Sequence, residues 1–202
     1  MVKIYGTSQS RAARSLWAAE EVGLKYEHVP VAPNTGTRKP EYLKINPNGH
    51  VPALDDNGLI LFESMAINLY LAEKYGKSPL WPSTVEGRGQ AYQWSVWAMT
   101  ETEPHLLTVL MHRMFLPQAQ RSEAAASSAI ESLKAPLKVL DDALKNRAYL
   151  LGSDFTIADL NVASVLSLAA IIKLDMTATP AVGKWLQTCL GRPAMQKARS
   201  MK

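Results

Sequence analysis

The chain has 202 residues, 47% of them hydrophobic, which is enough for one large domain or two small ones. Its single cysteine, Cys189, excludes a disulfide framework and a zinc site built from several thiolates. The net charge of +4 is spread along the chain without a basic run, so nucleic-acid binding is disfavoured.

We expect no targeting segment at the amino terminus, because residues 1–5 already follow an alternating strand pattern. The longest apolar run, residues 162–172, is interrupted by two serines and is too short to cross a bilayer. We therefore expect a cytoplasmic protein that does not enter a membrane.

Strand and helix patterns alternate through the first eighty residues. Asn57-Gly58 supplies the positive φ angles of a tight hairpin turn, and Pro30 places its strand at a sheet edge. The order β-α-β-α-β-β-α predicts an α/β domain with a mixed sheet over residues 1–76. Strands are predicted at 3–5, 26–31, 51–54 and 59–61, and helices at 10–22, 40–45 and 64–75.

Residues 77–85 contain Pro79 and Pro82 and break the periodicity, which is typical of a linker between domains. No strand pattern follows, so residues 86–202 are predicted to form an all-helical domain. Pro104 is expected to kink or interrupt the first of its helices. Helices are predicted at 86–115, 122–146, 156–172, 180–190 and 194–201.

Several common catalytic motifs are absent from the sequence. The four histidines show no i, i+4 pair and no HExxH motif, so we predict no metal site. Phosphate-binding glycine loops and the GxSxG nucleophile elbow are also missing.

Three hydroxyl-bearing residues, Thr7, Ser8 and Ser10, lie between the first predicted strand and the first predicted helix. Such residues can act simply as helix caps. Alternatively, one hydroxyl and the helix N-terminus together could face an anion, because helix amides and the macrodipole favour negative charge there.

Two further fragments suggest a ligand with a peptide backbone. A cis bond before Pro52 would leave the backbone of Val51 free to pair with something extended. Ser64 begins a helix, where its hydroxyl and nearby N–H groups would hold a carboxylate. Glu63 would add a negative charge for an ammonium group.

These fragments, in this order and spacing, resemble the amino-terminal domain of a cytosolic glutathione S-transferase, and the resemblance extends over essentially the whole chain. The segments that carry it are residues 3–6 (KIYG), 10–14 (SRAAR), 20–27 (EEVGLKYE), 46–54 (NPNGHVPAL), 62–67 (FESMAI), 153–159 (SDFTIAD) and 192–194 (RPA). Residues 153–159 resemble the family's capping box, in which Thr156 caps a helix and Asp159 reaches back.

The resemblance implies a thioredoxin-like domain, an all-helical domain, and usually a homodimer with glutathione as co-substrate. Carried over residue by residue, it assigns Lys39 and His50 to the glycyl carboxylate, where Arg38 also lies, Val51 and Pro52 to the cysteinyl part, and Glu63 and Ser64 to the γ-glutamyl group. The reactive sulfur would then come from the ligand, because Cys189 is remote in sequence from the hydroxyl turn.

Ser10 matches the hydroxyl that contacts the thiol in serine-type members, when counted from the strand. Counted back from Gly23, the register shifts by one residue onto Gln9, so Ser8 and Thr7 stay open as alternatives. The turn contains neither tyrosine nor cysteine. This implies a serine-type member, phi-like or of a related bacterial or fungal class.

We therefore predict a detoxifying glutathione transferase that activates the thiol as a thiolate for attack on an electrophilic small molecule. The alternatives are a glutathione-dependent peroxidase or disulfide-bond reductase on the same fold, or a non-catalytic glutathione-transferase-like binding protein. The electrophile is expected between the domains, against residues that could equally be bundle core: Met99, Thr100, Glu103, Leu107, Met111 and Met114.

Overall fold

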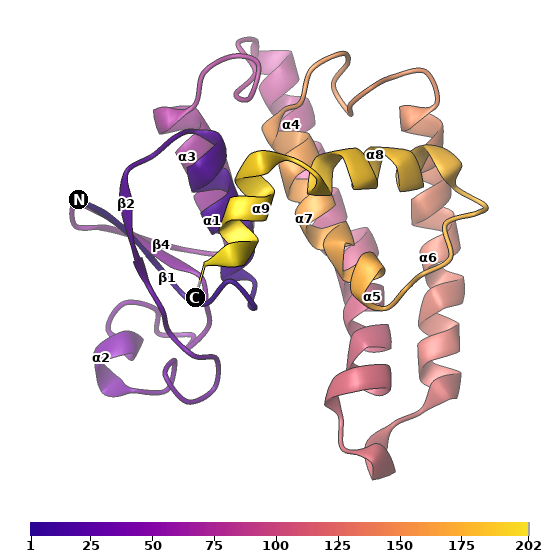
Figure 1. Ribbon diagram of the computed structural model, residues 1–202, viewed down its shortest axis with the longest axis horizontal. Coiled ribbons are helices and arrows are strands. Elements are labelled where there is room, and N and C mark those ends of the chain that lie inside the picture. The colour runs from indigo at the N-terminus through magenta and orange to yellow at the C-terminus, as the bar shows by residue number, and fades with distance from the viewer. Residues whose placement is uncertain (202) are drawn as a thin grey trace. The chain divides into compact units, whose positions relative to one another are not determined.

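The structure is a computed structural model that describes residues 1–201 (Figure 1). The chain forms two compact units. The first contains Met1–Trp81 together with the chain from Gly191 onward, and the second contains Pro82–Leu190. Among the described residues, no helix combines the length and the apolar character needed to span a bilayer.

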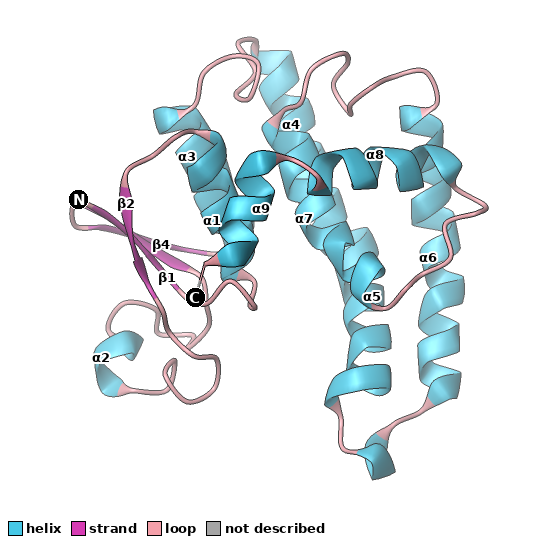
Figure 2. Ribbon diagram, in the orientation of Figure 1, coloured by secondary structure: helices cyan, strands magenta, loops and turns pink. Residues whose placement is uncertain are grey.

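A four-stranded mixed sheet forms the centre of the first unit (Figure 2). Its strands are β1 (Val2–Tyr5), β2 (Tyr26–Val29), β3 (Ala53–Asp56) and β4 (Leu59–Phe62). In the order β2-β1-β3-β4, β1 is parallel to β2 and antiparallel to β3, and β3 and β4 form the predicted hairpin. The predicted edge position of β2 is confirmed.

The helices of the first unit are α1 (Ala12–Glu21), α2 (Pro40–Leu43), α3 (Ser64–Tyr75) and α9 (Pro193–Ser200). Helix α1 ends at Glu21, and Gly23, which follows its C-cap Val22, has a φ of 64°. Gly23 N donates to Glu20 O and Leu24 N to Ala19 O, the two bonds of a Schellman cap. Helices α1 and α3 lie side by side, and their core residues Leu16 and Ile67 are fully buried (Figure 1).

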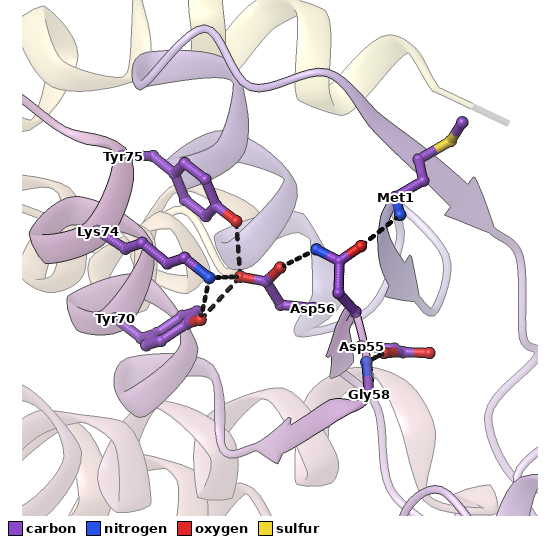
Figure 3. A network of polar contacts seen from close by, with 8 residues as sticks. Met1, Asp55, Asp56, Gly58, Tyr70, Lys74 and Tyr75 are labelled. Carbon is purple, nitrogen blue, oxygen red and sulfur yellow. Dashed lines mark hydrogen bonds and ion pairs between the residues drawn. The ribbon is translucent and has the colours of Figure 1, made fainter.

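The β3–β4 hairpin is tied to α3 by one buried carboxylate (Figure 3). Asp56 on β3 accepts hydrogen bonds from Lys74 Nζ at 2.6 Å, Tyr75 Oη at 2.6 Å and Tyr70 Oη at 2.7 Å. Its other oxygen accepts from Asn57 Nδ2 at 2.7 Å. Burial alone would raise the pKa of Asp56, but these four donors outweigh it and hold the pKa below its usual range.

Helix α9 joins the first unit, although the sequence analysis grouped residues 86–202 in the helical domain. It packs along α1, with Met195 at 3% exposure and Ala198 at 0%. Residues from the two ends of the chain therefore share one hydrophobic core, a difference from the predicted division.

The second unit is all-helical, as predicted. Its α-helices are α4 (Val85–Trp97), α5 (Glu103–Leu110), α6 (Glu123–Leu144), α7 (Ile157–Ile171) and α8 (Pro180–Leu190), with a short 3₁₀ turn at Gln118–Gln120. The helix predicted over 86–115 is interrupted by π-helical turns at Ala98–Thr102 and Met111–Phe115. Pro104 lies in the first turn of α5, where its missing N–H costs no hydrogen bond, so the expected interruption is confirmed.

Helix α7 is almost wholly buried, and the capping box at its start is confirmed. Asp159 Oδ2 accepts from Thr156 N and from Thr156 Oγ1, both at 2.9 Å. Asp159 Oδ1 accepts from Leu150 N at 2.8 Å and from Trp185 Nε1 at 2.9 Å. One carboxylate thus fixes the start of α7 to α8 and to the loop after α6.

Candidate functional site

Gly6 is the point at which the end of β1 and the start of α1 lie beside Val51. A methyl group added at Gly6 would lie 2.5 Å from the Cβ of Ala12 and 3.0 Å from the Cβ of Val51, and the φ of Gly6 is +127°. Only a residue without a side chain allows this approach. The hydroxyl turn and the segment before Pro52 are therefore neighbours, as the predicted site requires.

Ser10 lies just before α1, and its hydroxyl takes part in the turn. Its Oγ donates to Thr7 O at 2.8 Å and accepts from Ala12 N at 3.1 Å. The backbone N of Ser10 also donates to Thr7 O, at 3.0 Å. Rotation of the hydroxyl would free its hydrogen for a ligand at this helix N-terminus, where Arg11 provides no side-chain cap.

The two alternative hydroxyls differ from Ser10. Ser8 Oγ donates to the main-chain carbonyl of Met201 at 2.5 Å, a contact across 193 positions of sequence. The half-buried Thr7 hydroxyl makes no hydrogen bond within residues 1–201. Among the three hydroxyls, that of Ser8 therefore donates its hydrogen to a segment that is distant in sequence.

The loop before Val51 is held by side chains that the sequence analysis did not single out. Asn46 Nδ2 and Tyr42 Oη each donate to His50 O at 2.7 Å. Burial raises the pKa of Tyr42 to about 12, which keeps its hydroxyl protonated as a donor. These bonds fix the chain that enters the Val51-Pro52 bond, which is cis as anticipated.

Glu63 and Ser64 form the start of α3. Glu63 is exposed and has a φ of 72°, a strained value for a residue with a side chain. No side chain caps the helix there. Ser64 is 4% exposed, and its Oγ lies 3.5 Å from Nη1 of Arg14, which is itself only 5% exposed. A buried guanidinium therefore lies behind an uncapped helix N-terminus, a favourable place for a carboxylate.

Lys39 and His50 are exposed and make no side-chain ion pair or hydrogen bond within residues 1–201. Lys39 lines a pocket of about 450 Å³ between the ends of β1 and β2 and the segment that leads into α2. Val51, Glu63 and Ser64 lie outside the lining of that pocket. No described contact places Lys39 or His50 beside Ser10 or Ser64.

The residues predicted for the electrophile lie in the second unit, and their exposure varies. Glu103 is 3% exposed, so its carboxylate belongs to the interior of that unit. Met111 and Met114, in the second π-helical turn, are 40% and 47% exposed and keep accessible apolar surface. Met99 and Leu107 are half-buried.

The metal-ligating side chains of residues 1–201 form no cluster. Within residues 1–201, no three side chains of His, Cys, Asp or Glu come together in a way that could hold a metal ion. Cys189 is fully buried in α8 and presents no accessible thiol.

Comparison with known sequences decides the family. The model of the glutathione S-transferase N-terminal domain matches residues 1–73, and that of the C-terminal domain matches residues 99–193. The chain belongs to the glutathione S-transferase family. The resemblance on which the sequence analysis relied is thereby confirmed.

Relatives of similar length support this membership. Glutathione S-transferase GstB of Escherichia coli is 30% identical over 98% of this chain and 97% of its own. Glutathione S-transferase 4 of Zea mays is 32% identical over 97% and 91% of the two chains. The crystal structure of a theta class glutathione S-transferase from Xanthomonas axonopodis pv. citri with glutathione bound aligns with a TM-score of 0.90 at 28% identity, covering 100% and 98%.

Within this glutathione S-transferase, Gly6 and Arg14 also shape the candidate site, and neither was singled out from the sequence. Gly6 belongs to the quoted KIYG fragment, and its position directly after a strand could have marked a close backbone approach. Arg14 reads as an exposed helix residue, because arginine is rarely buried in proteins, and nothing in the sequence reveals its contact with Ser64.

Proposed function

We propose that this glutathione transferase binds glutathione across the ends of β1, α1 and α3 and ionises its thiol for attack on electrophilic small molecules. The observation that supports this most is the meeting of the hydroxyl turn and Val51 at Gly6. A cysteinyl backbone paired with Val51 would bring its thiol close to the start of α1. Glutathione bound to the Xanthomonas relative gives independent support.

Each part of glutathione has a counterpart in the first unit. The γ-glutamyl carboxylate would accept from Ser64 Oγ and the free amides of α3, with the charge of Arg14 behind them. The γ-glutamyl ammonium would face Glu63, which is exposed and makes no ion pair within residues 1–201. The glycyl carboxylate would reach Lys39 and His50.

Ser10 is proposed to donate to the thiolate. A free thiol with a pKa of ~8.5 is only about 3% ionised at pH 7. Lowering its pKa by two units requires about 2.7 kcal/mol of preference for the thiolate. A hydrogen bond to a charged group contributes ~1.5–3 kcal/mol and a helix N-terminus ~0.3–1 kcal/mol, so no general base is needed.

The test replaces Ser10 by alanine and measures two quantities. Turnover with an activated aryl halide at pH 7 should fall about 10- to 100-fold, the equivalent of one charged hydrogen bond. The dissociation constant of glutathione should change less than about threefold, because the thiol contributes little to binding. Full activity in Ser10→Ala, together with its loss in Thr7→Ala, would move the role to Thr7.

The same assay separates the alternative activities. Turnover with hydroperoxides or mixed disulfides but not with aryl halides would favour the peroxidase or reductase. Glutathione binding without turnover of any of these substrates would favour a non-catalytic binding protein.

We also propose that the chain acts as a homodimer. Strand β4, at the sheet edge, exposes Leu59 at 46%, Ile60 at 37% and Phe62 at 38%, and an exposed apolar edge is prone to pair. Phe62→Glu should yield a monomer in light scattering at micromolar concentration. Val139→Glu, at an exposed position of α6, is the matched control and should stay dimeric.

A further inference from the structure

Residues 192–201, which we name the carboxy-terminal strap, are held to α1 by two ion pairs. Arg192 Nε and Nη2 donate to the two carboxylate oxygens of Glu21 at 2.6 and 2.8 Å. Lys197 Nζ lies 2.7 Å from Glu20 Oε2. The side chains of Glu20 and Glu21 are 10% and 8% exposed, so both charges are largely removed from water.

The end of the strap reaches the hydroxyl turn. The carbonyl of Met201 accepts from Ser8 Oγ at 2.5 Å, and Tyr26 Oη lies 3.3 Å from Met201 Sδ. Tyr26 Oη also lies 2.9 Å from Glu20 Oε1. The strap is thus held at both ends, and Ser8 is the point where it contacts the turn.

Ser8 and Ser10 belong to one hydrogen-bonded turn. The carbonyl of Thr7 accepts from both the N and the Oγ of Ser10, so the two ends of the turn are bonded across Ser8. A displacement of Ser8 would therefore shift the Ser10 hydroxyl. While Ser8 donates to Met201, it has no hydrogen left for a thiolate.

We propose that Ser8 is a positioning residue through which the carboxy-terminal strap sets the orientation of the Ser10 hydroxyl toward the glutathione thiol. This inference rests on the proposed function of Ser10. It assigns the hydroxyls of the turn to separate tasks, with Ser8 bound to the strap and Ser10 directed at the ligand.

The test is a cycle of variants that removes the donor, the acceptor or both. Ser8→Ala removes the donor, and a variant ending at Ser200 removes the Met201 carbonyl. The readout is the pKa of the bound glutathione thiol, followed by thiolate absorbance. Each change should raise this pKa by about half a unit to one unit, a three- to tenfold fall in the ratio of thiolate to thiol. The combined variant should show no further rise, because both changes break one contact.

Met201→Ala is the matched control, because it keeps the main-chain carbonyl and removes only the sulfur contact. It should leave the thiol pKa within about 0.2 units of the unaltered chain, and Ser8→Thr, which keeps a hydroxyl, should do the same. A full effect of Ser8→Ala in the variant ending at Ser200 would overturn the proposal, because Ser8 would then contact the thiol itself.

Hydrogen exchange of residues 7–12 without glutathione gives a second readout. We expect faster exchange in Ser8→Ala and in the variant ending at Ser200, and unchanged rates in Met201→Ala. This result would show that the strap stabilises the turn. Unchanged exchange in both would overturn it. If the unaltered chain bound no glutathione, the proposed function would fail separately, and exchange alone would decide the role of the strap.

Discussion

Gly6 combines two constraints that no other residue type satisfies. A side chain there would have to adopt φ = +127° and lie within 2.5 Å of the Cβ of Ala12. We expect Gly6→Ala to lower the free energy of unfolding by about 2–4 kcal/mol and to weaken glutathione binding. Urea denaturation and calorimetric titration measure the two effects.

Gly89→Ala is the matched control for this change. Gly89 lies inside α4, and nothing lies within 4 Å of an added methyl group. It should leave stability unchanged or raise it by up to about 1 kcal/mol. Equal stability of the Gly6→Ala and Gly89→Ala variants would contradict the steric role of Gly6.

Local patterns revealed some residues of the candidate site and not others. The position of Ser64 at a helix start and of the hydroxyls in the turn could be predicted, because helix starts and strand-to-helix turns leave a signature within a few residues. The bond from Ser8 to Met201 could not, because its partners are 193 positions apart and a main-chain carbonyl has no signature in the sequence.

Helix α3 is anchored at its far end by Asp56, which fixes the hairpin to Tyr70, Lys74 and Tyr75. Asp56→Asn should lower the free energy of unfolding by about 2–4 kcal/mol at pH 7, because it removes a buried charge from its donors. The contribution of Asp56 is complete above its unfolded pKa of ~3.9 and is lost as the pH falls through its lower folded pKa.

Urea denaturation from pH 7 down to pH 2 measures this dependence. The stability difference between the unaltered chain and Asp56→Asn should be largest above about pH 4 and shrink below it. Asp154→Asn, at an exposed position, should show little difference at any pH. A pH-independent difference for Asp56→Asn would refute the electrostatic origin of the effect.

At the start of α7, Asp159 accepts four hydrogen bonds in the interior of the second unit. Asp159→Ala would leave these donors without an acceptor, so we expect a loss of about 3–5 kcal/mol in the free energy of unfolding. Thermal unfolding followed by circular dichroism measures it. Asp154→Ala provides the exposed control, and an equal loss in both variants would contradict the capping role.

Elements were predictable where one periodic pattern covers a whole segment. Helix α3 has the predicted bounds, because its helical pattern ends where Gly76 follows, but Ser64 is the first residue of the helix and not the predicted cap. Strand β3 lies at 53–56 rather than at the predicted 51–54. Its bounds follow from its pairing with β1, and the sequence of one strand does not show which residues of its neighbour it pairs with. The π-helical turns beside α5 likewise reflect packing that helix propensity does not encode.

The two ends of the described chain belong to the same unit, because the chain from Gly191 onward packs with residues 1–81. The division at a proline-rich linker was predictable from composition, but the return of α9 was not, because its pattern is that of any amphipathic helix. Long-range ion pairs such as Arg192 with Glu21 decide which surface it covers.

We expect this ion pair to couple the strap to α1 by about 1–2 kcal/mol, because Glu21 is largely buried and the contact is bidentate. A double-mutant cycle of Arg192→Ala and Glu21→Ala in urea measures the coupling, which should fall in 1 M salt. The exposed pair of Lys134 and Glu131 serves as control, with less than about 0.5 kcal/mol expected. Equal coupling energies for the two pairs would contradict the view that the Arg192–Glu21 pair is stronger because Glu21 is buried.

The position of the strap in the chain has a consequence for synthesis. The ribosome makes β1, α1 and the hydroxyl turn first, and then residues 82–190, before Met201 exists to accept from Ser8. At roughly 5–20 residues per second, the 193 positions from Ser8 to Met201 take roughly 10–40 seconds to synthesise. The nascent protein would therefore pair its sheet early and acquire its final turn geometry only after Met201 has been synthesised.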